Sequence, residues 1–379
     1  MDNYRELRQS LHRLPEISGK EKNTAGAILA FLEKYHPDKI VTGIGGYGIV
    51  ALFNGKHTGL RVMVRCELDA LPIPETLDIP HRSEAKGVSH KCGHDGHMAI
   101  VAGLAEYYHL HPPEAGSVML LFQPSEETGE GAERVLNDPK FREFLPDYVL
   151  ALHNLPGYSL GEIILRPGVF ASASSGLHFH LQGQTAHAAE PEKGRSPALA
   201  VAQLIQALSA IPQFHTSLHE ATQVTVIQAR VGEIAYGTSP GEGDVRATLR
   251  AHSQEVIDHL QEKAIELAKH TAATYGLELS VNATELFPST KNDAEVLKII
   301  DKSARQAGLN IHYKDIPFAW SEDFGHFTAR YKGALFGLGA GENHPVLHHP
   351  DYDFPDELIE LGVNIFIRVI KELQGGCYV

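Results

Sequence analysis

Cysteine is scarce in this chain of 379 residues: its three copies, Cys66, Cys92 and Cys377, are an odd number and lie far apart. This usage excludes a disulfide framework of the kind that stabilises small secreted domains. A surplus of basic residues is also lacking, since the formal net charge is -14. The basic stripe needed for nucleic-acid binding is therefore not expected, and we predict no nucleic-acid partner.

Long apolar runs are missing as well. No stretch approaches the roughly 20 apolar residues that a membrane-spanning helix needs. The first residues, MDNYRELRQSLHRLP, are charged from the second position and lack the apolar centre of a signal peptide. With 43% hydrophobic and 21% charged residues, the composition is that of a globular protein, which we expect to be cytoplasmic and without membrane association.

Short apolar strands alternate with helices in the first third of the chain and again near its end. This alternation is typical of an α/β fold with a mixed, mostly parallel sheet flanked by helices. The expected helices are 21–35, one from about Gly96, 294–308 and 356–373, and the expected strands are 48–55, 59–69, 117–122, 147–152 and 333–339.

The middle of the chain has a different pattern. Strand, helix, strand, strand, helix and strand are expected in that order, which is the order of the ferredoxin-like unit. We therefore predict that residues 1–171 and 286–379 form one α/β domain and that 172–285 form an inserted α+β domain. The expected elements of the insertion are 175–183, 196–211, 222–229, 243–251, 254–276 and 277–284.

The sequence GIGGYG (Gly43 to Gly48) matches the glycine pattern of dinucleotide-binding loops. That fingerprint requires a strand before the glycines and a helix after them, whereas IVALFNG follows here and is strand-like. We interpret the glycines as a turn between strands.

Polar groups that can bind metal or transfer protons stand at the ends of four predicted strands. Ligands of open α/β sheets bind beyond the carboxyl ends of the strands, so these groups are candidates for one site. They are Glu67 and Asp69, Glu126 and Glu127, His153, and the trio His344, His348 and His349.

The stretch HKCGHDGH adds further candidates just before a predicted helix. Cys92 and His94 are two apart in an extended segment and can project to the same side, while Asp95 is placed to cap a helix that begins near Gly96. Thiolate, imidazole and carboxylate together suit zinc, or zinc with a second first-row ion. The alternative is a polar loop around a buried, unreactive cysteine.

Glu126 and Glu127 follow an apolar strand and a proline. If the strand's alternation continues, the two carboxylates point to different sides, so that one binds metal and the other accepts a proton from water. The alternative is a pair of solvated glutamates. His187, in the inserted domain, is by itself a surface histidine.

These motifs resemble a known group of enzymes. RCELDALPIPE, HKCGHDGH, FQPSEE, LHNLP, TAHAAEP, SEDF and LHHPDYDF follow one another as in the metal-dependent amidohydrolases and metallopeptidases that include hippurate hydrolase, N-acetyldiaminopimelate deacetylase and the indoleacetyl-amino-acid hydrolases, with aminoacylase as more distant kin. The similarity begins at LHRLPEIS and covers nearly the whole chain.

The resemblance implies a site for two divalent metal ions per subunit, Zn²⁺ or Mn²⁺, with Co²⁺ or Ni²⁺ as further candidates. Glu126 would be the general base and acid, His187 would stabilise the oxyanion, and Asp69 would orient a ligand histidine. The inserted domain would be a lid and a surface for homodimer formation. The implied ligands are Cys92 as the bridge, His94, Glu127, His153 and His348.

Two positions depart from the family pattern. Glu67-Leu68-Asp69 stands where Asp-Met-Asp is usual, which keeps the charge. Gly237, in GTSP, stands where the lid usually carries an asparagine that helps to bind substrate. The second departure leaves the metal ligands intact but leaves the identity of the substrate open.

The sequence therefore predicts a hydrolase that cleaves the amide bond of small N-acyl amino acids or related acylated compounds. A dipeptidase or carboxypeptidase with the same metal site is an alternative. Others are a binding protein for acyl amino acids that does not cleave them, and purely structural metals. Arg246 or Arg250 could hold a substrate carboxylate, although exposed strand arginines are more common.

Overall fold

The computed structural model describes residues 2–375, so Cys377 lies outside the described residues. The chain divides into two compact units. Unit 1 consists of Met1–Phe170, Thr290–Pro317 and Asp323–Val379, and unit 2 of Ala171–Ser289 and Phe318–Glu322. Unit 2 is thus inserted into unit 1. Its second segment, Phe318–Glu322, lies outside the predicted boundaries of 172 and 285.

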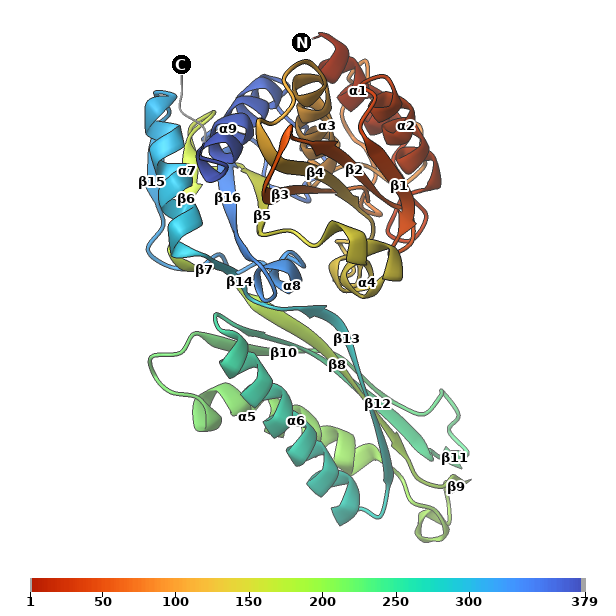
Figure 1. The fold of residues 1–379 in the computed structure, drawn as a ribbon. Helices are drawn as coiled ribbons and strands as arrows, with labels where there is room; N and C mark the ends of the chain where they lie inside the picture. The colour runs from red at the N-terminus through yellow and green to blue at the C-terminus, as the bar shows by residue number, and fades with distance from the viewer. Residues whose placement is uncertain (1, 376–379) are drawn as a thin grey trace. The chain divides into compact units, whose positions relative to one another are not determined.

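Unit 1 is built on one eight-stranded sheet with the order β1-β2-β4-β3-β5-β16-β6-β15 (Figure 1). The four central strands β4, β3, β5 and β16 are mutually parallel, and antiparallel pairs lie toward both edges. This confirms the predicted mixed, mostly parallel sheet. The strands are β1 (Lys39–Ile44), β2 (Gly48–Asn54), β3 (His57–Glu67), β4 (Ala115–Gln123), β5 (Tyr148–Leu155), β6 (Ile163–Leu165), β15 (Ile311–Tyr313) and β16 (Lys332–Gly339).

Helices flank this sheet, and α3 packs with α1 and α9 in the apolar core (Figure 1). Helix α1 was not predicted, because its sequence is mostly polar. The helices are α1 (Asp2–Arg13), α2 (Lys22–Glu33), α3 (His94–Leu110), α4 (Gly131–Asn137), α7 (Ala294–Gln306), α8 (Gly325–Thr328) and α9 (Glu357–Leu373), with a 3₁₀ turn η1 (Pro139–Phe144) and the short strands β7 (Gly168–Ala171) and β14 (Thr290–Asn292).

Alternation along β3 shows how the sheet divides its side chains. Val62, Val64 and Cys66 belong to the apolar core, whereas the buried side chain of Arg65, between two of them, hydrogen-bonds Gln123. Successive residues of a strand face opposite sides of the sheet. One face is therefore apolar beneath the helices, and the other contains a buried polar network.

Unit 2 has the predicted order of strands and helices. Its sheet, β10-β12-β8-β13, is antiparallel throughout, and α5 and α6 share an apolar core with it. The elements are β8 (Ala173–Gln182), α5 (Ala198–His215), β10 (Thr222–Val231), β12 (Glu242–Ala251), α6 (Gln254–Thr274) and β13 (Glu278–Phe287), with the small pair β9 (Ala186–His187) and β11 (Thr238–Ser239) and a 3₁₀ turn η2 (Pro191–Lys193).

The glycine-rich GIGGYG segment is a hairpin turn, as predicted. It joins the antiparallel strands β1 and β2, with Ile44 opposite Gly48. Gly43, Gly45 and Gly46 have positive φ angles of 70°, 61° and 125°, which glycine adopts at no steric cost.

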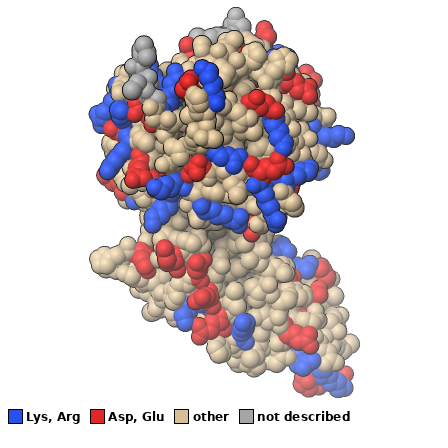
Figure 2. All heavy atoms as spheres, viewed as in Figure 1, with Lys and Arg blue, Asp and Glu red and all other residues tan. Residues whose placement is uncertain are grey.

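Within residues 2–375 no helix combines the length and the apolar character needed to cross a membrane. Cys66 and Cys92 form no disulfide in this part of the chain. On the face drawn in Figure 2, acidic and basic side chains are interspersed over unit 1. The cytoplasmic location inferred from the sequence stays a prediction.

Candidate metal centre

The predicted site residues of unit 1 meet at one edge of its sheet. The central strands are parallel neighbours, so their carboxyl ends lie together. The residues that gather there are Asp69 after β3, Glu126 and Glu127 after β4, His153 in β5, His348 after β16, and the pair Cys92 and His94 at the start of α3.

All five predicted metal ligands take part in close groups, and within each group the candidate donor atoms lie within 4.8 Å of one another. Cys92 belongs to two groups and stands between them, with its Sγ 3.5 Å from Nε2 of His153. A thiolate shared by two sets of ligands is the arrangement that a bridged pair of ions requires. Three of the five groups in the described residues are Cys92 with His94 and His153, Cys92 with Glu127 and His348, and His94 with Glu126 and Glu127; the other two are Glu67 with His94 and His97, and Glu126 with Glu322 and Asp323.

Two of the histidines are turned so that Nε2 faces the cluster. Nδ1 of His94 donates to the backbone oxygen of Asp69 at 2.8 Å, and Nδ1 of His153 donates to that of Asn154 at 2.9 Å. The buried Nε2 of His94 has no hydrogen-bond partner among the described residues. A carbonyl on one ring nitrogen fixes the other as a metal-binding atom, so the residues present fit a metal ion.

Electrostatics agree with this fit. Burial would lower the pKa of His94, but the carboxylates of Glu67, Glu127 and Asp69 outweigh burial and raise this pKa to about 9. The cluster thus attracts positive charge. For His153, burial and the nearby His97 lower the pKa to about 3, which keeps the imidazole neutral, the form that binds metal.

Glu126 and Glu127 do not continue the alternation of β4, so the condition under which they would point to different sides is not met. β4 ends at Gln123, and Ser125 adopts a left-handed φ of 55°. Both carboxylates then lie on the same side, with Oε2 of Glu126 and Oε1 of Glu127 each 3.9 Å from Nε2 of His94. The left-handed residue therefore brings two adjacent carboxylates to one site.

The predicted helix start was also wrong in detail. α3 begins at His94 rather than near Gly96, and its N-cap is Gly93, with φ at 85°. A Cβ at Gly93 would lie 2.6 Å from the side chain of Asn154, so only glycine fits. Asp95 lies inside the first turn and makes no cap; its carboxylate instead accepts from side chains of α1.

The last ligand candidate, His348, also has a left-handed backbone, with φ at 65°. Its N–H donates to the backbone oxygen of Lys91 at 2.8 Å, and its Nε2 lies 3.9 Å from Oε1 of Glu127. Strained residues of this kind persist where the surrounding structure holds them. The contact ties the His348 loop to the segment that precedes Cys92.

Asp69 contacts the two segments that carry the ligand candidates His94 and Glu127. Its backbone oxygen accepts from His94, and its Oδ2 accepts from the N–H of Glu127 at 3.0 Å and from Oγ of Ser18 at 2.6 Å. The carboxylate therefore holds the backbone of Glu127, and its Oδ1 also lies 3.7 Å from Nδ1 of His94.

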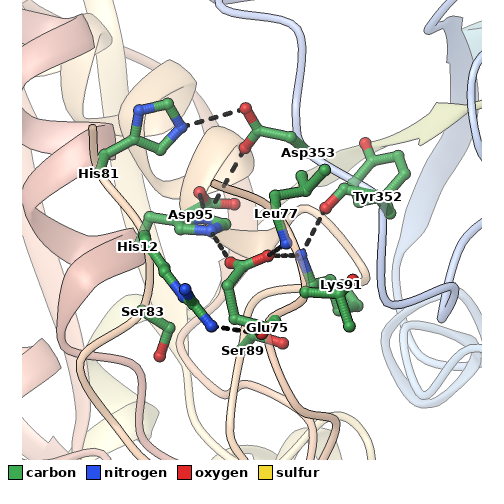
Figure 3. A network of polar contacts seen from close by, with 12 residues as sticks. His12, Glu75, Leu77, His81, Ser83, Ser89, Lys91, Asp95, Tyr352 and Asp353 are labelled. Atoms are coloured by element: carbon green, nitrogen blue, oxygen red, sulfur yellow. Dashed lines mark hydrogen bonds and ion pairs between the residues drawn. The ribbon is translucent and has the colours of Figure 1, made fainter. Parts of the chain in front are cut away.

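A buried charged network, which the sequence did not reveal, includes Lys91 and Asp95, the residues on either side of the Cys92–His94 segment (Figure 3). Lys91 donates to Glu75 at 2.5 Å, Glu75 contacts His12 at 2.8 Å, and His12 contacts Asp95 at 2.8 Å. Lys91 also donates to the backbone oxygen of Tyr352 at 2.7 Å. We call this chain of contacts, together with Arg8, the α1 network.

Arg8 completes the α1 network. It is fully buried, with its Nε 2.9 Å from Asp95, and it also contacts Asp353 and Asp356. Burial would lower the pKa of Arg8, but these three carboxylates outweigh burial and raise it. For Glu75, burial favours a higher pKa, but hydrogen bonds from His12 and Lys91 lower it to about 2. The α1 network therefore keeps Arg8 as a cation and Glu75 as an anion.

A second buried network lies on the other face of the sheet. Arg65 contacts both Glu67 and Asp323, and Oε2 of Glu67 accepts from Nδ1 of His97 at 2.7 Å. Nε2 of His97 then accepts from the N–H of Asn154, beside His153. Glu67, which stands where the family usually has aspartate, thus contacts both Arg65 and His97.

His187 lies in unit 2, on the short strand β9, where it pairs with Thr238 of β11. Its side chain is exposed, and Nδ1 accepts from the N–H of Ala189 at 3.1 Å. The oxygen of Gly237 accepts from Ala188, and a Cβ at Gly237 would meet no atom within 4 Å. No steric requirement explains this glycine.

The two arginines that were considered for a substrate carboxylate have partners within unit 2. Arg250 donates to the backbone oxygen of Ala319 and to Oγ of Ser321, both at 3.2 Å, and Arg246 donates to Gln228 at 2.8 Å. These contacts are structural, so they favour the common alternative of strand arginines over a substrate-binding role.

Comparisons with known proteins agree with this chemistry. The chain is 28% identical over 368 residues to N-acetyldiaminopimelate deacetylase of Exiguobacterium sibiricum, covering 97% of this chain and 98% of the relative. It is also 28% identical over 368 residues to hippurate hydrolase of Campylobacter jejuni, covering 97% and 95%.

A solved structure has the same fold. A dinuclear metal-binding peptidase of the M20 family from Bacillus subtilis superposes with a TM-score of 0.82 at 23% identity, covering 99% of this chain and 98% of that one. The sequence profile of peptidase family M20/M25/M40 matches residues 63–372. The resemblance is thereby confirmed: the chain belongs to peptidase family M20/M25/M40 and is an amide-bond hydrolase.

Proposed function

We propose that the chain hydrolyses the amide bond of an N-acyl amino acid or a related small acylated compound, at a pair of divalent metal ions. The observation that supports this most is the position of Cys92 in two ligand groups with Glu126 beside them. Zn²⁺ or Mn²⁺ suit the mixed donor set, and Co²⁺ or Ni²⁺ are further candidates. The proposed ligands are Cys92 as the bridge, His94, Glu127, His153 and His348.

When bound, the ions would polarise the acyl carbonyl and lower the pKa of the attacking water. Glu126, whose side chain is almost completely buried, accepts the proton of that water and later delivers it to the leaving amine. Asp69 supports this step by fixing the backbone of Glu127 and the ring of His94.

His187 is proposed to stabilise the oxyanion, from its own subunit or from a partner subunit. Nδ1 accepts a hydrogen bond from Ala189, so a neutral His187 carries its proton on Nε2. An exposed N–H of this kind is a suitable donor to a developing negative charge. Unit 2 would then act as the lid.

Unit 2 is also proposed as the surface for homodimer formation. Several large apolar side chains of unit 2 are almost fully exposed, including Leu218 at 98% and Tyr236 at 99%. Among the described residues, β10 and β13 are the edges of its sheet, and exposed edges favour pairing with another chain. Sedimentation of the purified chain, with a monomer as the opposing outcome, tests this assignment.

The decisive test of the mechanism is Glu126→Gln. The variant should bind metal as the wild type does, while kcat falls by about a thousandfold or more, because the amide cannot accept the proton. Glu130→Gln is the matched control, since Glu130 is an exposed glutamate in the same acidic segment. Near-normal turnover by Glu126→Gln would refute the role of Glu126.

A substrate panel separates the candidate activities. Metal-free protein is reconstituted with zinc, manganese or cobalt and assayed on N-acetyl amino acids, hippurate and dipeptides. Preference for acylated amino acids supports the proposal. Faster cleavage of dipeptides would make the chain a dipeptidase or carboxypeptidase instead, and binding without cleavage of any member would make it a binding protein.

A further inference from the structure

One buried carboxylate near the site has no part in the proposed chemistry. Glu21 precedes α2 and is fully buried. Its Oε1 accepts hydrogen bonds from the N–H of Gly19 at 2.8 Å, from the N–H of Ser125 at 2.9 Å and from Oγ of Ser125 at 3.3 Å. Burial raises its pKa, so keeping this carboxylate in the interior is costly.

The residue that Glu21 holds is the left-handed Ser125. Residues other than glycine avoid a φ near 55° because their Cβ crowds the following carbonyl oxygen. This conformation ends the alternation of β4 and directs both Glu126 and Glu127 toward His94. Without it, adjacent carboxylates of an extended chain would point to opposite faces.

Backbone hydrogen bonds also hold the loop that follows Ser125. The oxygen of Ser125 accepts from Gly131, and the oxygen of Glu126 accepts from Gly129, which closes a tight turn. A Cβ at Gly131 would lie 1.7 Å from the backbone oxygen of Pro124, so the turn as it stands accepts no larger residue there. Glu127 is fixed separately, through the contact of its N–H with Asp69. Glu21 thus accepts from both the N–H and the hydroxyl of Ser125, while Oγ1 of Thr128 donates to the oxygen of Ser125 at 3.3 Å.

We propose that Glu21 is a positioning residue for the reaction: it stabilises the left-handed conformation of Ser125 and thereby directs the carboxylate of Glu126 into the site. This inference rests on the proposed role of Glu126 as general base. Glu21 itself touches no reacting atom.

Removing the acceptor tests the proposal. Glu21→Met should lower kcat by about 30-fold with KM within about twofold, because a misplaced base affects the chemical step more than binding. Glu21→Gln retains an acceptor oxygen and should stay within about threefold of the wild type. Hydrogen exchange of a peptide covering residues 121–132 should accelerate in Glu21→Met, with or without added metal.

Ser125→Gly should restore part of the kcat that Glu21→Met loses. If Glu21 only stabilised the fold in general, Ser125→Gly would restore no activity. Because glycine adopts positive φ freely, Glu21→Met combined with Ser125→Gly should recover roughly tenfold in kcat over Glu21→Met alone. The control combines Glu21→Met with His36→Gly, another left-handed position with φ at 45°, and should recover nothing. Equal recovery in both would overturn the proposal.

A second pair of variants keeps the test valid if Glu21→Met does not fold. With Glu21 intact, Ser125→Asn and Ser125→Val introduce side chains of similar size, but only asparagine tolerates the left-handed region. The asparagine variant should be at least about tenfold faster in kcat, and equal rates would contradict the inference.

Glu126→Gln, measured in the same assay, separates the two hypotheses. If Glu126→Gln is active, the proposed function fails whatever Glu21 does. If Glu126→Gln is inactive while Glu21→Met keeps full kcat and normal exchange at residues 121–132, only the positioning role is lost.

Discussion

The two units both combine histidine, carboxylate and arginine, but under different conditions. In the α1 network of unit 1, Arg8, His12 and Asp95 are completely buried. In unit 2, Asp244 on β12 is also buried, but its partners His178, His180 and Arg230 have side chains that are 26%, 32% and 49% exposed. We therefore expect the removal of one charged partner to lower the free energy of unfolding much more in the α1 network than in unit 2.

The reason is desolvation. A buried ion pair gains little over apolar packing, but removing one partner leaves a charge that water cannot reach. A pair at the surface exchanges its partner for solvent at small cost. In addition, the α1 network reaches Asp95, beside His94, and the oxygen of Tyr352, shortly after His348. The Asp244 cluster (Asp244, His178, His180 and Arg230) contacts no proposed ligand among the described residues of unit 2.

The largest expected effect is that of Arg8→Leu. The change leaves Asp95 buried without its guanidinium, so the free energy of unfolding should fall by about 3 kcal/mol or more. Denaturant titration measures this. Arg305→Leu, which removes an exposed arginine paired with Asp301, should leave the curve almost unchanged. Similar losses for both variants would erase the distinction between buried and exposed pairs.

Lys91→Met probes the link between the α1 network and the ligands. Lys91 joins Glu75 to the oxygen of Tyr352, and its own oxygen holds His348. Loss of such outer contacts typically weakens metal binding by about 10- to 100-fold, and competition with a chelator should show this range. Lys332→Met, at an exposed ion pair with Glu295, is the control. Unchanged metal affinity would confine the network to a role in stability.

Asp244→Asn tests the unit 2 cluster and its pH dependence. Burial would raise the pKa of Asp244, but hydrogen bonds from His180, His178 and Arg230 lower it to about 2. A lowered folded pKa gives stability that is present above the unfolded value of about 3.9 and is lost as pH falls toward 2.

The difference in unfolding free energy between the wild type and Asp244→Asn should therefore be at most about 1 kcal/mol near neutrality and should shrink below about pH 4. Thermal unfolding at several pH values measures it. A difference that grows on acidification would contradict the assigned direction.

Gly237→Asn should have the smallest effect on stability, within about 0.5 kcal/mol, because a Cβ there meets no atom within 4 Å. Gly93 in unit 1 is the opposite case, since its Cβ would strike Asn154. KM values for N-acetyl amino acids show whether the asparagine usual in the family alters substrate binding. Unchanged KM values throughout the panel would remove Gly237 from the determinants of specificity.

Much of the site was predictable because its residues follow apolar strands. Glu126, Glu127 and His153 stand directly after or within segments whose pattern indicates buried parallel strands, and ligands bind beyond such strand ends. Arg8 and His12 gave no comparable signal, because charged residues in an amphipathic helix usually face solvent. Only their contacts with Asp95 and with Asp353, far along the chain, make them interior groups.

The errors share a physical origin. The helix start near Gly96 and the alternation of Glu126 and Glu127 were both inferred from regular secondary structure. Gly93 and Ser125 instead adopt left-handed backbones, Gly93 at a position where an added Cβ would strike Asn154 and Ser125 in contact with Glu21. Neither contact is local in sequence.

The sequence by itself determined the α/β class, the order of elements in the inserted unit and the kinds of side chain available to bind metal. These follow from periodic burial, which each segment carries in its own residues. Tertiary structure alone decided which carboxylates face His94, which charges are buried and which residues hold them. Those outcomes depend on contacts between distant segments, where desolvation and backbone strain are balanced by partners that no local pattern specifies.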